Sequence, residues 1–226
     1  MSNVGIIGGG VSGVISAIYA SKNGNKVTIL EKNNDILKKL LITGSGRCNY
    51  FNSDQNIKHY HSKNEECLKE IITKENTKEL CKFYDSIGIV PKIKDGYYYP
   101  YSNMAISVKN ALVTEVLKSN IKVICNYDVK SVDYKNNEFI VNNDKHFDKL
   151  IISTGSKAYP KTGSDGFGYS LAKKLGHTIN EVKPALVSLC SDDKILNIIS
   201  GVRANAKISL YHFDELLKEE IGEVQF

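Results

Sequence analysis

The feature that most constrains the fold of this chain is a glycine pattern close to its N-terminus. Gly8, Gly10 and Gly13 follow a short apolar run and open a segment with helical spacing that ends at Lys22. A second β-branched run ends at Glu31. In a strand–turn–helix–strand unit, successive glycines allow a tight turn, close approach of the backbone to a pyrophosphate, and helix–strand packing. The chain therefore opens as half of a Rossmann-type fold.

This unit predicts a dinucleotide site. The helix that begins at Val11 and Ser12 directs its N–H groups and its dipole at the pyrophosphate. Glu31 lies about 20 residues beyond the glycines, where a carboxylate accepts hydrogen bonds from the ribose hydroxyls, and Lys32 adjoins it. A carboxylate there disfavours the 2′-phosphate of NADP. The alternative is a glycine-rich turn with only a structural role.

Composition places the chain among folded globular proteins. It has 226 residues, of which 42% are hydrophobic and 24% charged, and a net charge of +5 is too dispersed for a dedicated nucleic-acid binder. The five cysteines form no C-x-x-C pair and the histidines lack ligand spacing, so no metal site is predicted. We expect a cytoplasmic protein, because no stretch has the ~18 apolar residues that span a bilayer and the N-terminus lacks a signal peptide's basic region.

Further elements follow from periodicity and turn residues. The expected elements, in chain order, are a helix at 63–86 broken near 76, a hairpin at 90–94 and 97–101, a helix at 105–117, a β-meander at 122–125, 128–134 and 138–141 continued by 145–147, a strand at 150–153, and a helix at 168–175. Short β-like runs at 186–189, 206–211 and 223–226 then indicate a different, β-rich region. We therefore predict domains at 1–185 and 186–226.

The later architecture favours FAD over NAD. A β-meander followed by an apolar strand that ends in Thr154 and Gly155 resembles the second signature of two-dinucleotide-fold flavoproteins. In those proteins, the strand pair around the position of Val129 supplies backbone contacts to the adenine. We assign Val129, Thr154 and Gly155 to the FAD site on this resemblance.

The loop from Thr43 to Asn49 is a second candidate for cofactor contact. It is rich in glycine, with Gly44 and Gly46, and its N–H groups are suited to the flavin pyrimidine or the pyrophosphate. Arg47, one of only two arginines in a lysine-rich chain, is suited to neutralise negative charge there. The alternatives are a plain turn for the loop and, for Cys48, a packed small side chain rather than a redox thiol.

For two other motifs, the sequence leaves both a structural and a functional interpretation open. Tyrosines of the strand at 97–101 are suited to strand packing or to stacking on a base. The run 162–166 opens a helix, so its Ser164 and Asp165 serve either as an ordinary N-cap or as part of a phosphate site.

Longer motifs give a closer resemblance. The motifs that carry it are 39–49, 99–103 with Ala105, 154–155 with 159–169, and 176–177. Through these motifs the chain resembles the BaiN-like flavoproteins, also described as aminoacetone-oxidase-type NAD(P)/FAD-dependent oxidoreductases. The resemblance covers most of the chain and implies that Lys39 also belongs to the FAD site. Lys38 stands where the family commonly has Arg, and residues 50–52 also depart from its pattern, so neither position is assigned a role.

The resemblance implies a doubly wound α/β FAD domain and hydride transfer through the flavin N5. The expected substrate is an unidentified small organic molecule, with NAD(P)H a candidate electron donor and no nucleic-acid or membrane partner. Such proteins are about twice as long, with an inserted β-rich domain and a returning segment that completes the FAD site. We therefore expect this chain to be truncated, to bind FAD weakly or not at all, to associate, and to show no steady turnover. No catalytic residue is assigned.

Two rival functions stay open at the sequence level. An NAD-dependent dehydrogenase would use a Tyr-x-x-x-Lys pair such as Tyr169 and Lys173. A flavin-fold module that binds RNA or a protein partner would use a lysine-rich face.

Overall fold

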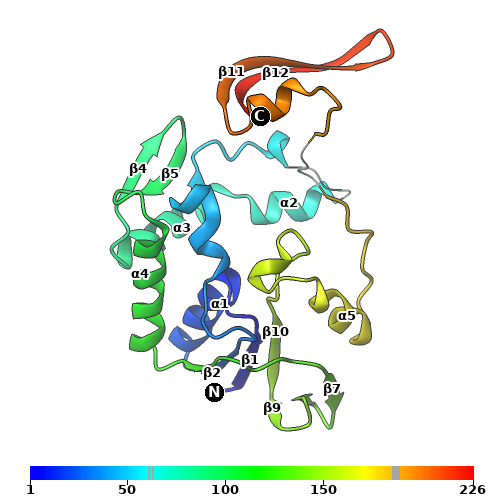
Figure 1. Cartoon of the computed structure of the whole chain (residues 1–226). Helices are drawn as coiled ribbons and strands as arrows, with labels where there is room; N and C mark the ends of the chain where they lie inside the picture. Colours follow the sequence, from blue (N-terminus) through cyan, green and yellow to red (C-terminus); the bar gives the residue numbers. More distant parts are fainter. Residues whose placement is uncertain (61, 63, 185–188) are drawn as a thin grey trace. The chain divides into compact units, whose positions relative to one another are not determined.

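The computed structural model describes residues 1–60, 62, 64–184 and 189–226. The chain forms two compact units, Met1–Glu181 and Val182–Phe226 (Figure 1). The predicted domain boundary between 185 and 186 falls outside the described residues and stays a prediction.

A four-stranded parallel sheet forms the centre of the first unit. Its strand order is β10 (Lys149–Ile152), β1 (Asn3–Ile7), β2 (Lys26–Leu30) and β6 (Lys122–Ile124). β1 pairs in parallel with β10 on one side and with β2 on the other. β1 and β2 are buried almost throughout, as expected for parallel strands covered on both faces. The α/β Rossmann-type prediction is confirmed.

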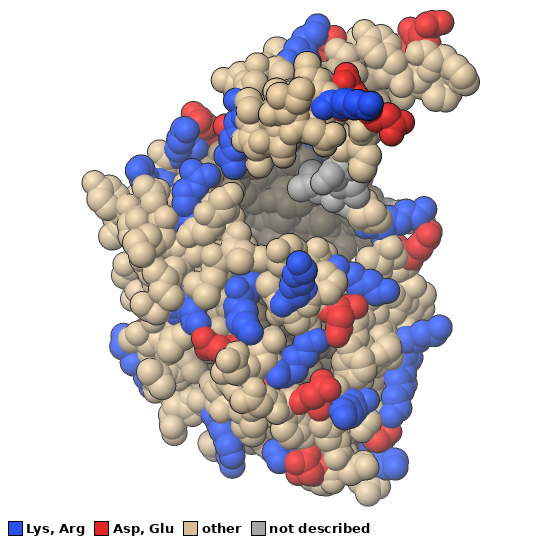
Figure 2. Space-filling model, in the orientation of Figure 1, with Lys and Arg blue, Asp and Glu red and all other residues tan. Residues whose placement is uncertain are grey.

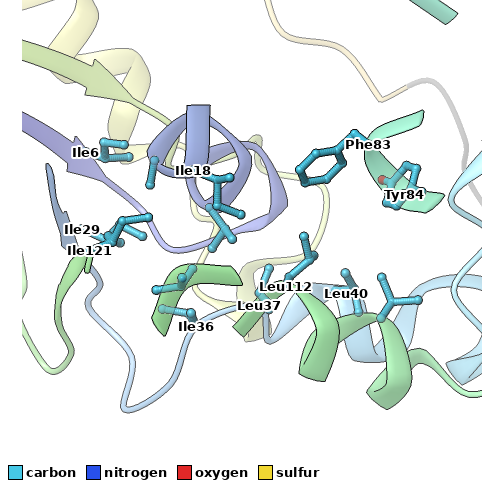
Figure 3. Packing of buried hydrophobic residues seen from close by; sticks show 14 of the residues in the cluster. Ile6, Ile18, Ile29, Ile36, Leu37, Leu40, Phe83, Tyr84, Leu112 and Ile121 are labelled. Atoms are coloured by element: carbon cyan, nitrogen blue, oxygen red, sulfur yellow. The ribbon is translucent and has the colours of Figure 1, made fainter. Parts of the chain in front are cut away.

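Helix α1 (Val11–Lys22) lies against this sheet, and α4 (Ala105–Lys118) packs beside α1, close to the predicted range of 105–117. Ile18 of α1 and Leu112 of α4 are fully buried in one core cluster together with Ile29 (Figure 3). This packing fixes the N-terminus of α1 at the end of β1, where the glycines lie.

The β-meander is built from different strands than predicted. β7 (Val132–Lys135), β8 (Glu138–Val141) and β9 (Lys145–Phe147) form an antiparallel sheet. The predicted first meander strand at 122–125 is instead β6, because its backbone continues the parallel ladder of β2.

The second correction concerns Val129, which lies in the loop before β7 rather than in a strand pair. The backbone N–H groups of Lys130 and Ser131 donate to the side-chain oxygen of Asn142, at 2.8 and 3.1 Å, so this segment does not form a strand ladder there. Val129 is nevertheless buried.

A small α/β lobe completes this side of the unit. Helices α2 (Glu65–Ile71) and α3 (Lys74–Ser86) replace the single broken helix, and the Thr73 hydroxyl caps α3 by accepting the Asn76 N–H at 3.0 Å. The break falls at this cap, three residues before Asn76. The predicted start at 63 lies outside the described residues.

The hairpin of β4 (Pro91–Lys94) and β5 (Tyr97–Pro100) is confirmed, with β3 (Phe51–Asn52) on its other edge. Asp95 and Gly96 both have positive φ, as a tight hairpin turn requires.

Short helices lie in the connecting segments: η1 (Lys39–Gly46), η2 (Ile57–His59) and η3 (Pro160–Thr162). Helix α5 (Phe167–Lys174) follows η3, close to the predicted helix at 168–175. Leu171 of α5 is buried against the meander residues Val132 and Val141.

The second unit contains α6 (Ile195–Ile198) and a long antiparallel hairpin of β11 (Arg203–His212) and β12 (Glu215–Gln225). β11 extends beyond both ends of the predicted run at 206–211. β12 begins before the predicted run at 223–226 and ends within it, at Gln225. The run at 186–189 falls almost entirely outside the described residues. No side chain of this unit is buried among those described.

In the part of the chain that the structure describes, no helix is both long and apolar enough to cross a membrane.

Candidate functional site

A cavity of about 650 Å³ lies at the carboxyl ends of β1, β2 and β10. Gly8 follows β1, Glu31 follows β2 and Ser153 follows β10, and all three line the cavity. Ligands of open parallel sheets bind outside this edge, and ligand sites typically enclose ~300–1,000 Å³. Position and size therefore make this cavity the candidate site.

The three glycines of the first loop have different roles. Gly8 has a φ of +105°, and an added Cβ would lie 2.6 Å from the Ser153 carbonyl oxygen. Gly10 lines the cavity, and a Cβ there would have nothing within 4 Å. The backbone at Gly10 therefore leaves open space at the N-terminus of α1, where a pyrophosphate is stabilised by N–H groups and the helix dipole.

Gly13 does not line the cavity. An added Cβ would lie 2.0 Å from the Gly8 carbonyl oxygen and 2.6 Å from the Ser153 hydroxyl. This glycine serves the close packing of α1 on the loops, which is the structural part of the glycine pattern.

Glu31 joins the end of β2 to the glycine loop. The residue is 7% exposed, and its Oε2 accepts a hydrogen bond from the Gly9 N–H at 2.7 Å. Its Oε1 accepts from the Asn33 backbone N–H at 2.8 Å and from the Asn33 side-chain amide at 2.6 Å. An ionised carboxylate has about four acceptor positions, so capacity remains for a ribose hydroxyl.

Three contacts connect the segment after β2 with the loop before α5. Lys32 Nζ lies 2.8 Å from Asp165 Oδ2, the Asn33 amide donates to the Thr162 carbonyl oxygen at 3.3 Å, and the Lys39 ammonium donates to the Ser164 hydroxyl. The hydrogen bond from Lys32 and that from the Phe167 N–H hold the pKa of the Asp165 carboxyl below its ordinary value. Because Asp165 Oδ1 accepts the Phe167 N–H at 3.0 Å, the turn that opens α5 has a structural role.

The structure brings most of the predicted site residues together at the cavity. Those that line it are Gly8, Gly10, Val11, Ser12, Glu31, Lys32, Lys39, Thr43, Cys48, Asn49, Val129, Thr154 and Gly155. These residues come from four separate stretches of sequence. Their convergence supports the grouping that the sequence analysis made.

Arg47, Gly44 and Gly46 do not line the cavity, like Gly13. Gly44 and Gly46 have φ values of +55° and +83° and allow the loop to turn. The Arg47 Nε donates to the Gly44 carbonyl oxygen at 3.1 Å, and its guanidinium lies 5.3 Å from the ring centroid of Tyr99. The arginine closes this turn, and its contact with a cofactor stays a prediction.

The apolar end of the cavity is defined by Leu37, Leu40, Cys48, Tyr50, Tyr84 and Val108. Of these, only Cys48 was predicted from the sequence. Burial raises the pKa of both Tyr50 and Tyr84 to about 12, and it also raises the pKa of the Cys48 thiol. In the sequence, Tyr84 belongs to the apolar stripe of a predicted helix, and such a stripe indicates only that the side chain packs in the hydrophobic core. Only tertiary packing reveals that this stripe also lines the cavity.

Asn33 and Tyr127 also line the cavity and were missed, because neither stands in a recognisable motif. Among the described residues, no group of three or more His, Cys, Asp or Glu side chains is arranged to hold a metal ion.

The parallel sheet, the open backbone at Gly10 and the buried Glu31 define a Rossmann-type domain. Residues 2–215 match the family described as the HI0933-like protein Rossmann domain. The chain belongs to this family, which is the BaiN-like, aminoacetone-oxidase-type family that the sequence motifs indicated.

Curated relatives include two kinds of enzyme. The chain is 36% identical over 230 residues to the 3-dehydro-bile acid delta(4,6)-reductase of Clostridium scindens, covering 100% of this chain and 56% of the relative. It is 27% identical over 206 residues to the ribosomal RNA dihydrouridine synthase of Haemophilus influenzae, covering 87% of this chain and 51% of that protein. The chain thus spans about half the length of these relatives.

Solved structures support the fold. The 3-ketosteroid-delta4-(5alpha)-dehydrogenase of Rhodococcus jostii, solved with 4-androstene-3,17-dione, aligns with a TM-score of 0.51 and 13% identity. The alignment covers 70% of this chain and 46% of that one.

Proposed function

We propose that this chain provides the FAD-binding part of a flavin-dependent oxidoreductase that reduces a carbon–carbon double bond conjugated to a carbonyl group. The observation that carries the proposal is the cavity in which the N-terminus of α1, the open backbone at Gly10 and the carboxylate of Glu31 face one space. Membership of the HI0933-like family supports FAD as the dinucleotide.

The residues fit such a cofactor. Gly10, Val11 and Ser12 would face the pyrophosphate, Glu31 would accept ribose hydroxyls, and Val129 would cover the adenine. Lys39, now bonded only to a neutral hydroxyl among the described residues, carries a positive charge suited to the pyrophosphate. Bound flavin supplies hydride transfer through its N5, while these residues position it and limit the access of water.

The relatives' names suggest the type of substrate. A delta(4,6)-reductase of a 3-dehydro bile acid and a synthase of dihydrouridine both add hydrogen to a ring double bond in conjugation with a carbonyl group. We infer the same bond type for this chain, with NAD(P)H as the electron donor.

A small organic substrate is favoured over RNA. Lys and Arg are interleaved with Asp and Glu over the face shown in Figure 2, whereas RNA-binding surfaces concentrate positive charge. Several lysines, including Lys109 and Lys174, pair with carboxylates. A dehydrogenase that uses Tyr169 and Lys173 is disfavoured, because neither residue lines the cavity.

The free thiols support a proposal for the cell compartment. All five cysteines are free, and free thiols are typical of a reducing environment, so we propose a cytoplasmic location.

The proposal is tested by anaerobic assay, with NADH or NADPH, of the purified oxidoreductase in which this chain is the FAD-binding part. A 4-en-3-one steroid, free uridine and a uridine-containing RNA serve as alternative acceptors, and mass spectrometry measures the gain of two hydrogens. We expect reduction of the steroid at a rate that depends on added FAD. Reduction of RNA alone would replace the small-molecule proposal, and FAD-independent oxidation of an alcohol would contradict both.

A further inference from the structure

The apolar end of the cavity combines apolar walls with two phenols. Leu37, Leu40 and Val108 are buried and line it as aliphatic surface. Tyr50 and Tyr84 lie against each other there, with ring centroids 4.6 Å apart and an interplanar angle of 50°. Figure 3 shows Tyr84 next to Phe83 at one side of the core cluster that contains Leu37 and Leu40.

The hydroxyl of Tyr84 has no hydrogen-bond partner among the described residues, although Tyr84 is only 7% exposed. The Tyr50 hydroxyl also has none in the described part of the chain. Among the described residues, no fully buried side-chain nitrogen or oxygen lacks a hydrogen-bond partner, so these two hydroxyls are open to the cavity. Both side chains line the cavity, so a ligand in it is the partner that these donors can reach.

The backbone around this end is held in an uncommon conformation. Leu37 and Cys48 have φ values of +61°, which non-glycine residues rarely adopt and which cluster at functional sites. The Leu37 N–H donates to the Gly9 carbonyl oxygen at 2.8 Å, and the Cys48 N–H donates to the Thr43 carbonyl oxygen at 2.9 Å. These bonds tie the apolar walls to the glycine loop and give the end a defined shape.

Tyr50 is fixed in the same way. Its backbone N–H donates to the carbonyl oxygen of Tyr98 on β5 at 3.0 Å, and its ring lies edge-on to that of Tyr98. A donor that is positioned before the ligand arrives loses little freedom on binding.

We propose that the apolar end is a carbonyl-binding subsite for the reducible substrate, in which Tyr84 donates a hydrogen bond to the substrate's carbonyl oxygen beside Tyr50. The ligand class is a flat or alicyclic apolar ring that carries a conjugated ketone. This inference rests on the proposed function and identifies the part of the cavity that recognises the substrate.

The chemistry of enone reduction suits a neutral phenol. When a hydride, supplied by a reduced flavin, adds to the β-carbon, the π electrons move onto the carbonyl oxygen, and the α-carbon later takes a proton from solvent. A donor aimed at that oxygen stabilises the developing charge. Because burial raises its pKa to about 12, Tyr84 stays protonated and able to donate throughout the neutral range.

The test uses the purified protein saturated with FAD and a 4-en-3-one steroid labelled with ¹³C at its carbonyl carbon. Wild type, Tyr84→Phe and the control Tyr98→Phe are compared, since Tyr98 is an aromatic neighbour that does not line the cavity. We expect the carbonyl resonance to move downfield on binding to wild type and to the control, and to move less with Tyr84→Phe. The steroid should bind that variant about 5- to 10-fold more weakly, as loss of one hydrogen bond implies.

Unfolding and cofactor measurements distinguish a carbonyl contact of Tyr84 from a role in stability or in flavin binding. Tyr84→Phe should melt at the wild-type temperature, because it removes a hydroxyl that is open to the cavity and makes no hydrogen bond among the described residues. Its FAD affinity should equal that of wild type. A weaker FAD affinity with an unchanged carbonyl shift would assign Tyr84 to the flavin and overturn the subsite.

Failure of the proposed function has a different signature. If wild type binds no FAD and reduces no enone, the proposed function is wrong. If wild type binds FAD and reduces the steroid while Tyr84→Phe keeps the full carbonyl shift and affinity, only the carbonyl subsite is wrong.

Discussion

The apolar end of the cavity differs from the end lined by Gly8, Gly10 and Glu31, which we call the nucleotide end. The difference is whether the polar groups have hydrogen-bond partners within the chain. At the nucleotide end, Glu31 already accepts hydrogen bonds from Gly9 and Asn33, so the chain itself holds the loop geometry. At the apolar end, the hydroxyls of Tyr50 and Tyr84 have no partners among the described residues. The nucleotide end is therefore organised by the protein, whereas the apolar end leaves its donors for a ligand.

The largest effect on stability is expected from adding a methyl group at Gly13, where helix α1 packs against the loop of the nucleotide end. Gly13→Ala would place a methyl group 2.0 Å from the Gly8 carbonyl oxygen, so we expect a loss of about 3 kcal/mol or more in the free energy of unfolding. Gly10→Ala is the matched control, because its methyl group meets nothing within 4 Å. Urea unfolding should show destabilisation only for Gly13→Ala, while FAD titration should show weaker binding for Gly10→Ala.

Equal stability of these two variants would contradict the assignment of Gly13 to packing. Unchanged FAD affinity of Gly10→Ala would show that the open space beside α1 is not the path of the cofactor.

The next effect concerns the carboxylate that joins the loops. Glu31→Ala should weaken FAD binding by about 1.5–3 kcal/mol per charge-assisted hydrogen bond lost, and it should lower stability because the Gly9 N–H loses its acceptor. Glu138→Gln changes an exposed carboxylate of the meander and serves as the control. If the two variants titrate alike with FAD, Glu31 does not belong to the nucleotide end.

The pH dependence of stability in the alkaline range should report the burial of Tyr84 at the apolar end. The pKa of Tyr84 is about 12 in the folded protein and ~10 in an unfolded chain. Stability from this group is complete below pH ~10 and is lost as the pH rises towards 12, because the unfolded state releases its proton first. The loss should amount to about 1–3 kcal/mol, and Tyr84→Phe should show a shallower decline in unfolding free energy from pH 9 to pH 12. Parallel curves for the two proteins would contradict the burial of this phenol.

The smallest effect on FAD affinity is expected from a change at Arg47, which lines neither end of the cavity. Its guanidinium stacks on Tyr99 and closes the turn at Gly44, so Arg47→Lys should change FAD affinity by less than about threefold, as exposed charged contacts are weak. A tenfold loss in FAD titration would instead support the sequence-based assignment of Arg47 to the cofactor.

The meeting of Gly8, Gly10 and Glu31 at one cavity could be predicted from the sequence because its determinants are local. Gly8, Gly10 and Glu31 lie at fixed distances within one strand–turn–helix–strand unit, and that unit imposes the geometry. The hairpin at Asp95 and Gly96 was predictable for the same reason, since its turn is encoded by two adjacent residues.

The apolar end could not be predicted because it is assembled from distant segments. Tyr84 reaches the cavity from α3 and Val108 from α4, and their sequence patterns indicate only burial. Likewise, the pattern of residues 122–124 indicates a strand but does not show which strand it pairs with. In the structure, this strand pairs in parallel with β2.

The central claim is that this cavity holds FAD. The most direct measurement is the mass of the small molecule released when the protein, isolated from its own cells, is denatured, followed by titration of the stripped protein with that molecule. We expect the mass of FAD and saturable rebinding that Gly10→Ala weakens. Release of a nicotinamide dinucleotide or FMN, or FAD that rebinds equally well to Gly10→Ala, would contradict the account.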